Sequence, residues 1–246
     1  MHIFFSHLLI NKTSRTIALV AGFCFLFNTA NAQQNGVMNQ PKYDYQKIHF
    51  GFTLGLNVSD FKVDLAPDFR VRDSVYTVLS EGVTGLNLGI LANLRIGNHF
   101  DLRFIPSLAF ASRNLRYFFI YNDTTRGEVL KSIESNYLEL PVCLKFKSKR
   151  IRNYRVYVLA GVKYTIDMIS QASVEAKDKE FVKLRKFDYG YEIGLGFDFY
   201  MPYFKFSPEI KMYHGLNDLL VQDGRIFSDP LQHLFAKTFT ISFMFE

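Results

Sequence analysis

Charged side chains recur at every second position in several segments of the chain. This spacing places acids and bases on one face of an extended strand, where they can pair across neighbouring strands. The predicted members of this charge network are Arg95, Asp101, Arg103, Glu139, Lys145, Lys163, Asp188, Glu192, Glu209 and Lys211. The same pattern adds Arg155, Asp167, Asp198 and Lys205 to that face. Because an isolated buried charge is very costly, we expect a structural network of ion pairs rather than a proton or ligand path.

Residue patterns for catalysis are weak. The histidines that follow the N-terminal segment are His49, His99, His214 and His233, and none has metal-ligand spacing with another His or Cys. His214, Asp218 and Ser228 could form the site of a lipid-modifying enzyme at the rim of a barrel, but no spacing rule supports them. We therefore expect no enzyme activity, no catalytic residues, no metal and no cofactor.

The first 32 residues predict a cleaved signal peptide. A basic region with Lys12 and Arg15 precedes an apolar core at 17–27, and Ala30 and Ala32 complete an A-x-A site that places the mature start at Gln33. A membrane-anchoring helix is the alternative, but the apolar run is too short for one. We expect an exported protein whose residues 33–46, which are polar, form a mobile periplasmic arm.

Composition narrows the class further. Of the residues, 48% are hydrophobic and 16% are aromatic, with 26 Phe, 14 Tyr and no Trp. Loss of Lys12 and Arg15 lowers the formal charge of +6 to about +4, which is too mild to favour nucleic acid binding. After cleavage Cys143 is the single cysteine, so no intramolecular disulfide can form and we expect inert packing there.

The elements that carry these charges alternate apolar and polar residues with a period of two, which indicates β-strands. At 136–147, for example, Leu138, Leu144 and Phe146 share one face while Glu139 and Lys145 share the other. The predicted strands are 48–59, 83–96, 100–110, 136–147, 154–167, 188–199, 204–212 and 238–245. The predicted long loops are 60–82, 113–131, 170–186 and 215–236, and they alternate with tight turns.

About eight strands with alternating long and short connections are typical of an up-and-down transmembrane β-barrel of the outer membrane. The fold class is therefore all-β, with the barrel at residues 47–246, the lipid on the apolar face and both termini in the periplasm. A soluble all-β barrel would need an apolar interior, whereas the interior face here is charged and rich in glycine. Pro106, Pro141 and Pro208 lie inside predicted strands, so we expect bulges or local breaks at these positions.

Two of these strands resemble a known family. Residues 137–146, YLELPVCLKF, are similar to the Tyr-Leu-Glu-Ile-Pro strand of the PorT-type (also SprT-type) outer-membrane β-barrels, and residues 50–59, FGFTLGLNVS, look like that family's first strand. The resemblance covers about residue 47 to the end. One departure from general outer-membrane practice is Glu246, which follows Phe245 where an aromatic residue is usually last.

The resemblance implies an accessory component of the type IX secretion system, required for export of cargo with C-terminal signals, such as surface proteases and gliding adhesins. It implies contacts with outer-membrane lipid and other secretion components, and no nucleic acid, small-molecule substrate or catalysis. The alternatives are a generic adhesin or structural barrel and the rim-site lipid-modifying enzyme.

Overall fold

The computed structural model describes residues 38–67, 75–122, 125–169, 182–224 and 227–246. The predicted signal peptide and its cleavage residues Ala30, Ala32 and Gln33 lie outside these ranges. Within the described ranges, no helix is long and apolar enough to cross a membrane.

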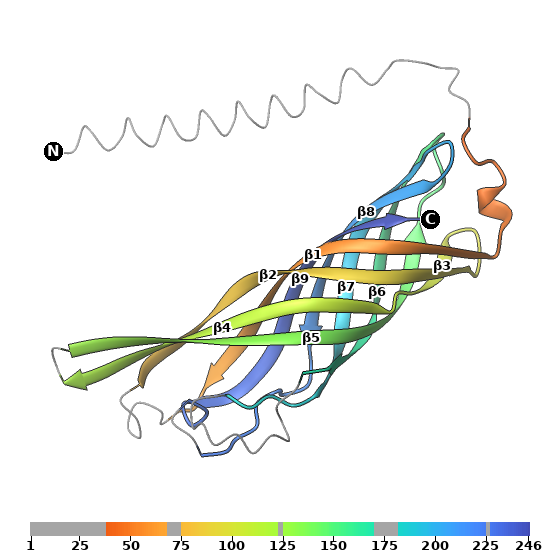
Figure 1. Ribbon diagram of the computed structural model, residues 1–246. Coiled ribbons are helices and arrows are strands. Elements are labelled where there is room, and N and C mark those ends of the chain that lie inside the picture. Colours follow the sequence, from red (N-terminus) through yellow and green to blue (C-terminus); the bar gives the residue numbers. More distant parts are fainter. Residues whose placement is uncertain (1–37, 68–74, 123–124, 170–181, 225–226) are drawn as a thin grey trace, which may run out of the picture. The chain divides into compact units, whose positions relative to one another are not determined.

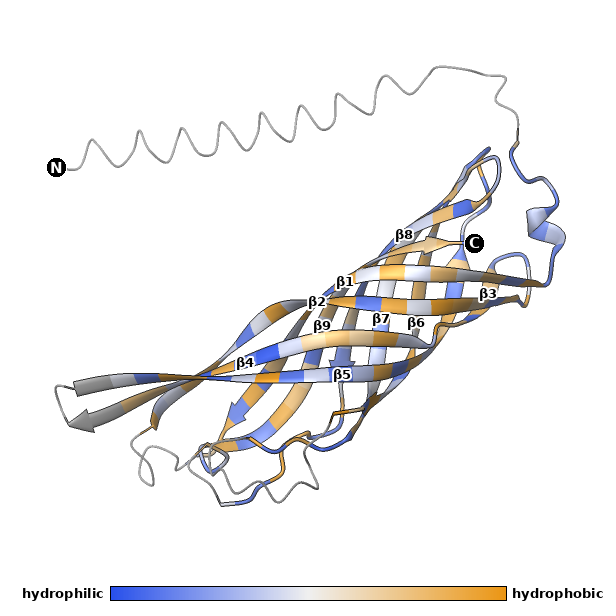
Figure 2. Cartoon of the chain, viewed as in Figure 1, coloured by the Kyte–Doolittle hydropathy of each residue, from blue (hydrophilic) through white to orange (hydrophobic). Residues whose placement is uncertain are grey.

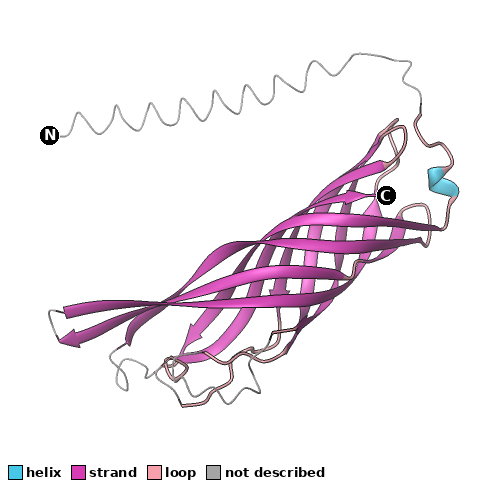
Figure 3. Ribbon diagram, in the orientation of Figure 1, coloured by secondary structure: helices cyan, strands magenta, loops and turns pink. Residues whose placement is uncertain are grey.

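The body from Asn39 to Glu246 is built almost wholly of antiparallel strands (Figures 1 and 3). A short 3-10 helix, η1, spans Tyr43–Tyr45. The strands are β1 (Ile48–Leu65), β2 (Val75–Arg95), β3 (Phe100–Phe104), β4 (Ser107–Asn122), β5 (Thr125–Lys147), β6 (Tyr154–Asp167), β7 (Phe187–Tyr200), β8 (Lys205–Gly215) and β9 (Leu231–Phe245). Neighbouring strands of the ring pair antiparallel in the order β1-β9-β8-β7-β6-β5, then β3 and β4 together, then β2. The pairing of β2 with β1 closes the ring into an up-and-down barrel.

The described residues form nine strands rather than eight because the predicted third strand is divided. β3 and β4 both pair with β2 and β5, and their register continues across the gap at Ile105 and Pro106. Pro141 on β5 lies opposite this gap. Neither proline can donate a ladder hydrogen bond, but the Pro106 and Pro141 carbonyls still accept from the Ile90 and Ile105 N–H groups. The predicted local break is confirmed there, and it occurs without a bulge.

Pro208 on β8 keeps the pairing with one neighbouring strand and interrupts the pairing with the other. It keeps its place opposite Phe243 on β9, whereas the pairing of β8 with β7 is interrupted between Glu209 and Phe206. The register on both sides of the interruption is unchanged. A proline therefore removes pairing locally without shifting a strand.

The two faces of the barrel are those that the alternation predicts. Outward apolar side chains are widely exposed, including Phe50 at 70%, Ile90 at 66% and Leu144 at 46%. The alternate polar positions, such as Asn57, Glu139 and Lys145, are buried inside the ring. Orange outer positions alternate with blue and white ones along the strands in Figure 2. A broad apolar outer surface around a charged interior is stable against lipid and not against water.

Three of the predicted long loops are shorter in the structure than predicted, because strands extend into them. Residues 60–65 and 75–82 belong to β1 and β2, residues 113–122 and 125–131 to β4 and β5, and residues 231–236 to β9. Figure 1 shows the β4–β5 hairpin projecting beyond the other strands. Most of the predicted loop at 170–186 lies outside the described residues, and no named strand covers 182–186.

The strands continue past the apolar band with their faces reversed. On β4 the outward positions after Phe110 become polar, as at Asn114 and Arg116, while Leu115 and Tyr117 are fully buried on the inner side. Such a pattern is typical of a sheet whose outer face meets water. The buried members of this loop-end core are Phe61, Val75, Val78, Leu115, Tyr117, Phe119, Val182, Leu184, Tyr213, Leu219, Leu220, Leu231, Leu234 and Ala236.

Candidate functional site

The charged interior forms a connected network at mid-barrel. The Arg103 Nη1 atom lies 2.7 Å from the Glu209 Oε2 atom, and both side chains are fully shielded from solvent. The Tyr157 hydroxyl donates to the same Glu209 oxygen at 2.7 Å. Lys211 lies 3.6 Å from Glu209 and 3.9 Å from Glu192, so one lysine links two carboxylates.

A second pair lies beside it. The Lys145 Nζ atom donates to both carboxylate oxygens of Asp198 at 2.9 Å, and Ser207 donates to Asp198 at 2.8 Å. The same ammonium group lies 3.6 Å from the centroid of the Tyr157 ring. Because each of these charges has an opposite charge within 4 Å, and most also have hydrogen-bond partners, the network avoids most of the cost of isolated buried ions.

Tyr157 occupies space that a glycine leaves open. Gly196 lies directly opposite it on β7, and a Cβ atom there would come within 2.5 Å of the Tyr157 ring. Gly196 on β7 therefore leaves the lumenal space that the Tyr157 ring fills.

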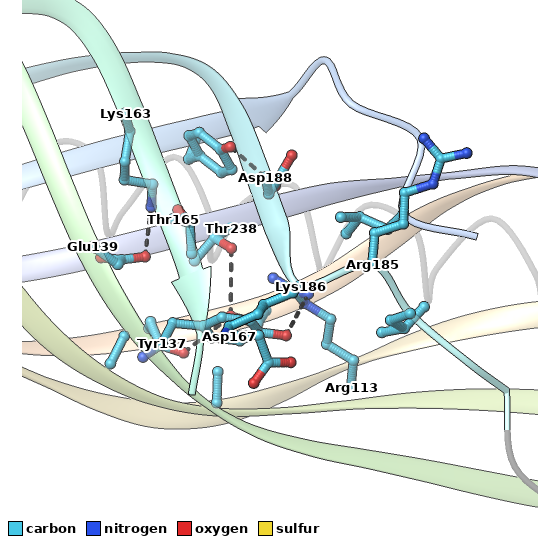
Figure 4. Close-up of a pocket in the computed structure, with 17 residues that line it drawn as sticks. Arg113, Tyr137, Glu139, Lys163, Thr165, Asp167, Arg185, Lys186, Asp188 and Thr238 are labelled. Carbon is cyan, nitrogen blue, oxygen red and sulfur yellow. Dashed lines mark hydrogen bonds and ion pairs between the residues drawn. The ribbon is translucent and has the colours of Figure 1, made fainter. Parts of the chain in front are cut away.

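The network extends toward the loop end (Figure 4). Lys163 donates to Glu139 at 2.6 Å, and Tyr213 donates to Asp188 at 3.0 Å. The cavity between these groups holds about 20 Å³, which is room for about one water molecule. The described part of the barrel is therefore filled by side chains at this level.

Two of the predicted network residues differ from the prediction in their partners. Asp101 forms an ion pair with Lys147, which was not among the predicted members. Arg95 lies at the rim and donates to Asn98 and the Gly97 carbonyl. Cys143 is buried and donates to Glu192 at 2.9 Å.

The end with the short turns is covered by residues that were predicted as a mobile arm. The residues of this arm from Asn39 onward make specific contacts with the barrel. Lys205 donates to the Tyr43 hydroxyl at 2.7 Å, and Tyr43 donates to Glu246 at 2.7 Å. Burial and the nearby Glu246 carboxylate raise the pKa of the Tyr43 phenol, which keeps it protonated as the donor.

Glu246 completes the network at this end. Its carboxylate lies 2.7 Å from Lys205 and 3.7 Å from Arg103, and its side chain is fully shielded. Simple alternation along β9 places residue 246 on the same inner side as Met244. The alternation along β9 was thus the sequence signal that Glu246 is a lumenal acid.

Asp218 and Ser228 of the alternative catalytic group, which no spacing rule supported, both contact other residues. Asp218 contacts His233, whose Nδ1 atom lies 3.0 Å from the Asp218 carboxylate, and Asp218 also accepts the backbone N–H groups of Leu220 and Leu234. Ser228 donates to Asp223 at 2.6 Å. Among the described residues, no three His, Cys, Asp or Glu side chains gather to form a metal site.

The comparison with known families agrees with this architecture. Residues 19–221 match the family described as "Outer membrane protein beta-barrel domain". The chain belongs to this family. It is an outer-membrane β-barrel protein, and its exposed apolar band is the surface that meets lipid. No curated protein matches the chain.

Solved structures include distant resemblances of similar size. Neisserial surface protein A is 9% identical over 81% of this chain and 98% of its own, with a TM-score of 0.40. OprG from Pseudomonas aeruginosa is 14% identical over 79% of this chain and 93% of its own, with a TM-score of 0.38. Ail, the attachment invasion locus protein of Yersinia pestis, is 14% identical over 81% and 99%, with a TM-score of 0.36.

Proposed function

We propose that this outer-membrane barrel is an accessory component of the type IX secretion system, required for export of cargo with C-terminal signals. The observation that carries the proposal is the resemblance of residues 137–146 to the PorT-type strand, and these residues lie within β5. Glu139, Pro141 and Lys145 of that strand each have a distinct place in the barrel: a partner for Lys163, the ladder gap, and a partner for Asp198.

The mode of action in this proposal is protein–protein contact. The filled interior supports it, because a barrel whose described lumen is occupied by paired charges offers cargo no path. The surfaces left for partners are the extended hairpins at the loop end and the arm-covered mouth at the other end. The proposal includes no catalysis and no cofactor.

The proposed orientation places the arm and the short turns in the periplasm and the β4–β5 hairpin outside the cell. Its support is the difference in connection length, since outer-membrane barrels have short periplasmic turns and longer outer loops. The other secretion components would then meet the mouth formed by the β2–β3 and β5–β6 turns.

The test is deletion of the gene followed by restoration from a plasmid. We expect cargo with C-terminal signals to accumulate in the periplasm of the deletion strain and to return to the surface with the plasmid copy. A matched plasmid carrying Lys62→Gln, at an exposed lysine beyond the apolar band, should restore export equally. Normal delivery of cargo to the surface of the deletion strain would contradict the secretion role.

A further inference from the structure

A basic groove opens at the short-turn end of the barrel. It lies between the β2–β3 turn and the β5–β6 turn and encloses about 290 Å³. We call it the basic mouth, and its cationic lining residues are Arg95, Lys147, Lys149, Arg150 and Arg155. His99 also lines it, and Asp44 of η1 is the acidic lining residue.

The positive charge of the basic mouth exceeds the carboxylates that reach it. Asp44 lies 2.9 Å from Arg155 and 3.7 Å from Arg150, and Asp101 pairs with Lys147. These two acids leave a surplus of cations.

The surplus resides on two residues. Arg95 donates only to the uncharged Asn98 side chain and to the Gly97 carbonyl, and Lys149 is exposed. Within the described ranges, neither contacts a carboxylate. Both remain able to bind an anion without breaking an existing ion pair.

A second observation points to an incomplete site. The Arg155 side chain is only 7% exposed, yet its Nε–H group has no hydrogen-bond partner in the described structure. A buried N–H group without a partner is costly, so an acceptor that reached it would be held strongly. Arg155 thus offers one donor to Asp44, and its buried Nε–H group is left without an acceptor.

Asp44 indicates which chemical group the basic mouth binds. It is a carboxylate carried on a short peptide segment that lies across the barrel end, and it is held by guanidinium groups. Among residues 33–46 Asp44 is the only acid, so the arm cannot neutralise the remaining cations by itself. A second acidic peptide segment has the complementary charge.

The position of the cations favours a partner from the aqueous side over a lipid. Lys147 and Arg155 are buried on the inner face of β5 and β6, while the outward neighbours Phe146 and Tyr154 are exposed. A lipid headgroup outside the wall would approach the outward side chains first. A peptide that approaches this end from the aqueous side reaches the basic mouth beside Asp44.

We propose that the basic mouth binds an acidic segment of a partner protein, whose carboxylates pair with Arg95 and Lys149 beside Asp44. That a partner protein exists follows from the proposed accessory role. Peptide binding at the basic mouth can be measured without a secretion assay, so the binding site and the secretion role can fail independently.

The experiment uses the full barrel, purified in detergent, and a fluorescent peptide of alternating Glu and Ser residues. Its control is the matched peptide with Gln in place of Glu. Anisotropy should show saturable binding of the acidic peptide that weakens with salt, because these ion pairs are partly exposed. The double variant Arg95→Gln/Lys149→Gln should weaken binding about tenfold.

Two further variants separate this effect from loss of folding. Lys42→Gln removes one positive charge at the same end but outside the basic mouth, and it should leave binding unchanged. Asp44→Asn should strengthen binding several-fold, because it frees Arg150 and Arg155 for the peptide. An increase in affinity cannot result from a misfolded barrel.

Three results would overturn the proposal. They are equal binding of the Gln peptide, unchanged binding to Arg95→Gln/Lys149→Gln, and displacement of the peptide by phosphatidylglycerol vesicles but not by neutral vesicles. The last would assign the basic mouth to a lipid headgroup. If the peptide binds as expected while cargo export does not depend on the gene, the site stands and the secretion role fails.

Discussion

Arg103 on β3 and Glu209 on β8 meet across the interior of the barrel, with 2.7 Å between the Nη1 and Oε2 atoms and no exposed side-chain surface on either residue. The strands that carry them are not neighbours in the ring. The pair therefore ties opposite walls of the barrel together and occupies the lumen.

Removal of one partner of this pair should be strongly destabilising. We expect Arg103→Met to lower the free energy of unfolding by about 3–5 kcal/mol, because Glu209 is then left buried without that charge. Urea unfolding in detergent micelles measures the change. The double variant Arg103→Met/Glu209→Leu should recover a large part of the loss, and a double variant that is as unstable as the sum of the single ones would contradict a buried pair.

An arginine introduced on the outer face of β5 tests where the lipid-facing band ends. Leu144 and Ser132 both point outward from β5, but only Leu144 lies in the apolar band. Leu144→Arg should lower the free energy of unfolding in lipid bilayers by about 2–4 kcal/mol, as expected for Arg near the bilayer midplane. Ser132→Arg should be nearly neutral. Similar costs at both positions would show that the band is misplaced.

Close packing at Gly196 provides a steric test. An added Cβ would lie 2.5 Å from the Tyr157 ring and 2.9 Å from the Pro208 carbonyl oxygen. Gly196→Ala should therefore cost about 1–3 kcal/mol through overpacking and disturb the Tyr157–Glu209 hydrogen bond. Gly97→Ala is the control, because nothing lies within 4 Å of its Cβ position. Equal stability of the two variants would indicate that Tyr157 is not held against β7.

The Asp218 carboxylate should make the loop between β8 and β9 sensitive to acid. Burial raises the pKa of Asp218, but bonds from His233 and the Leu234 and Leu220 N–H groups outweigh it, so the pKa lies below its ordinary value. A group with a lowered folded-state pKa stabilises above its unfolded pKa and loses that contribution as pH falls through the folded one.

Hydrogen exchange of the Leu220 and Leu234 amides measures this effect. After correction for intrinsic rates, protection should be constant near neutral pH and fall below an ordinary aspartate pKa of about 3.9. Asp218→Asn should reduce protection already at neutral pH. Protection that is independent of pH in the wild-type chain would contradict the role of the carboxylate.

The alternation of residues was sufficient to predict the faces of the barrel within the lipid band. There the surroundings are uniform, so a period of two distinguishes lipid from lumen at every position. It failed beyond Phe110 on β4, because the outer face there meets water and the inner face carries Leu115 and Tyr117. β4 continues past Phe110, but its apolar residues change from the outer to the inner face, and in the sequence this change resembles the end of a strand.

Individual ion pairs were harder to predict than the charged face. Alternation places Lys145 inside the ring, but its pairing with Asp198 depends on which strands lie across the lumen. The contacts of Asp44 with Arg150 and Arg155 depend on how the arm lies over the barrel end, which no period in the sequence specifies.

The central claim is that this barrel works through its surfaces and not through its lumen. Conductance of the purified protein in planar lipid bilayers tests that claim most directly. We expect no stable conductance steps, because paired charges and tyrosine side chains fill the described interior and leave a cavity of about 20 Å³ at the level of Glu139 and Lys163. A reproducible open channel formed by the wild-type protein would show that the lumen is not closed.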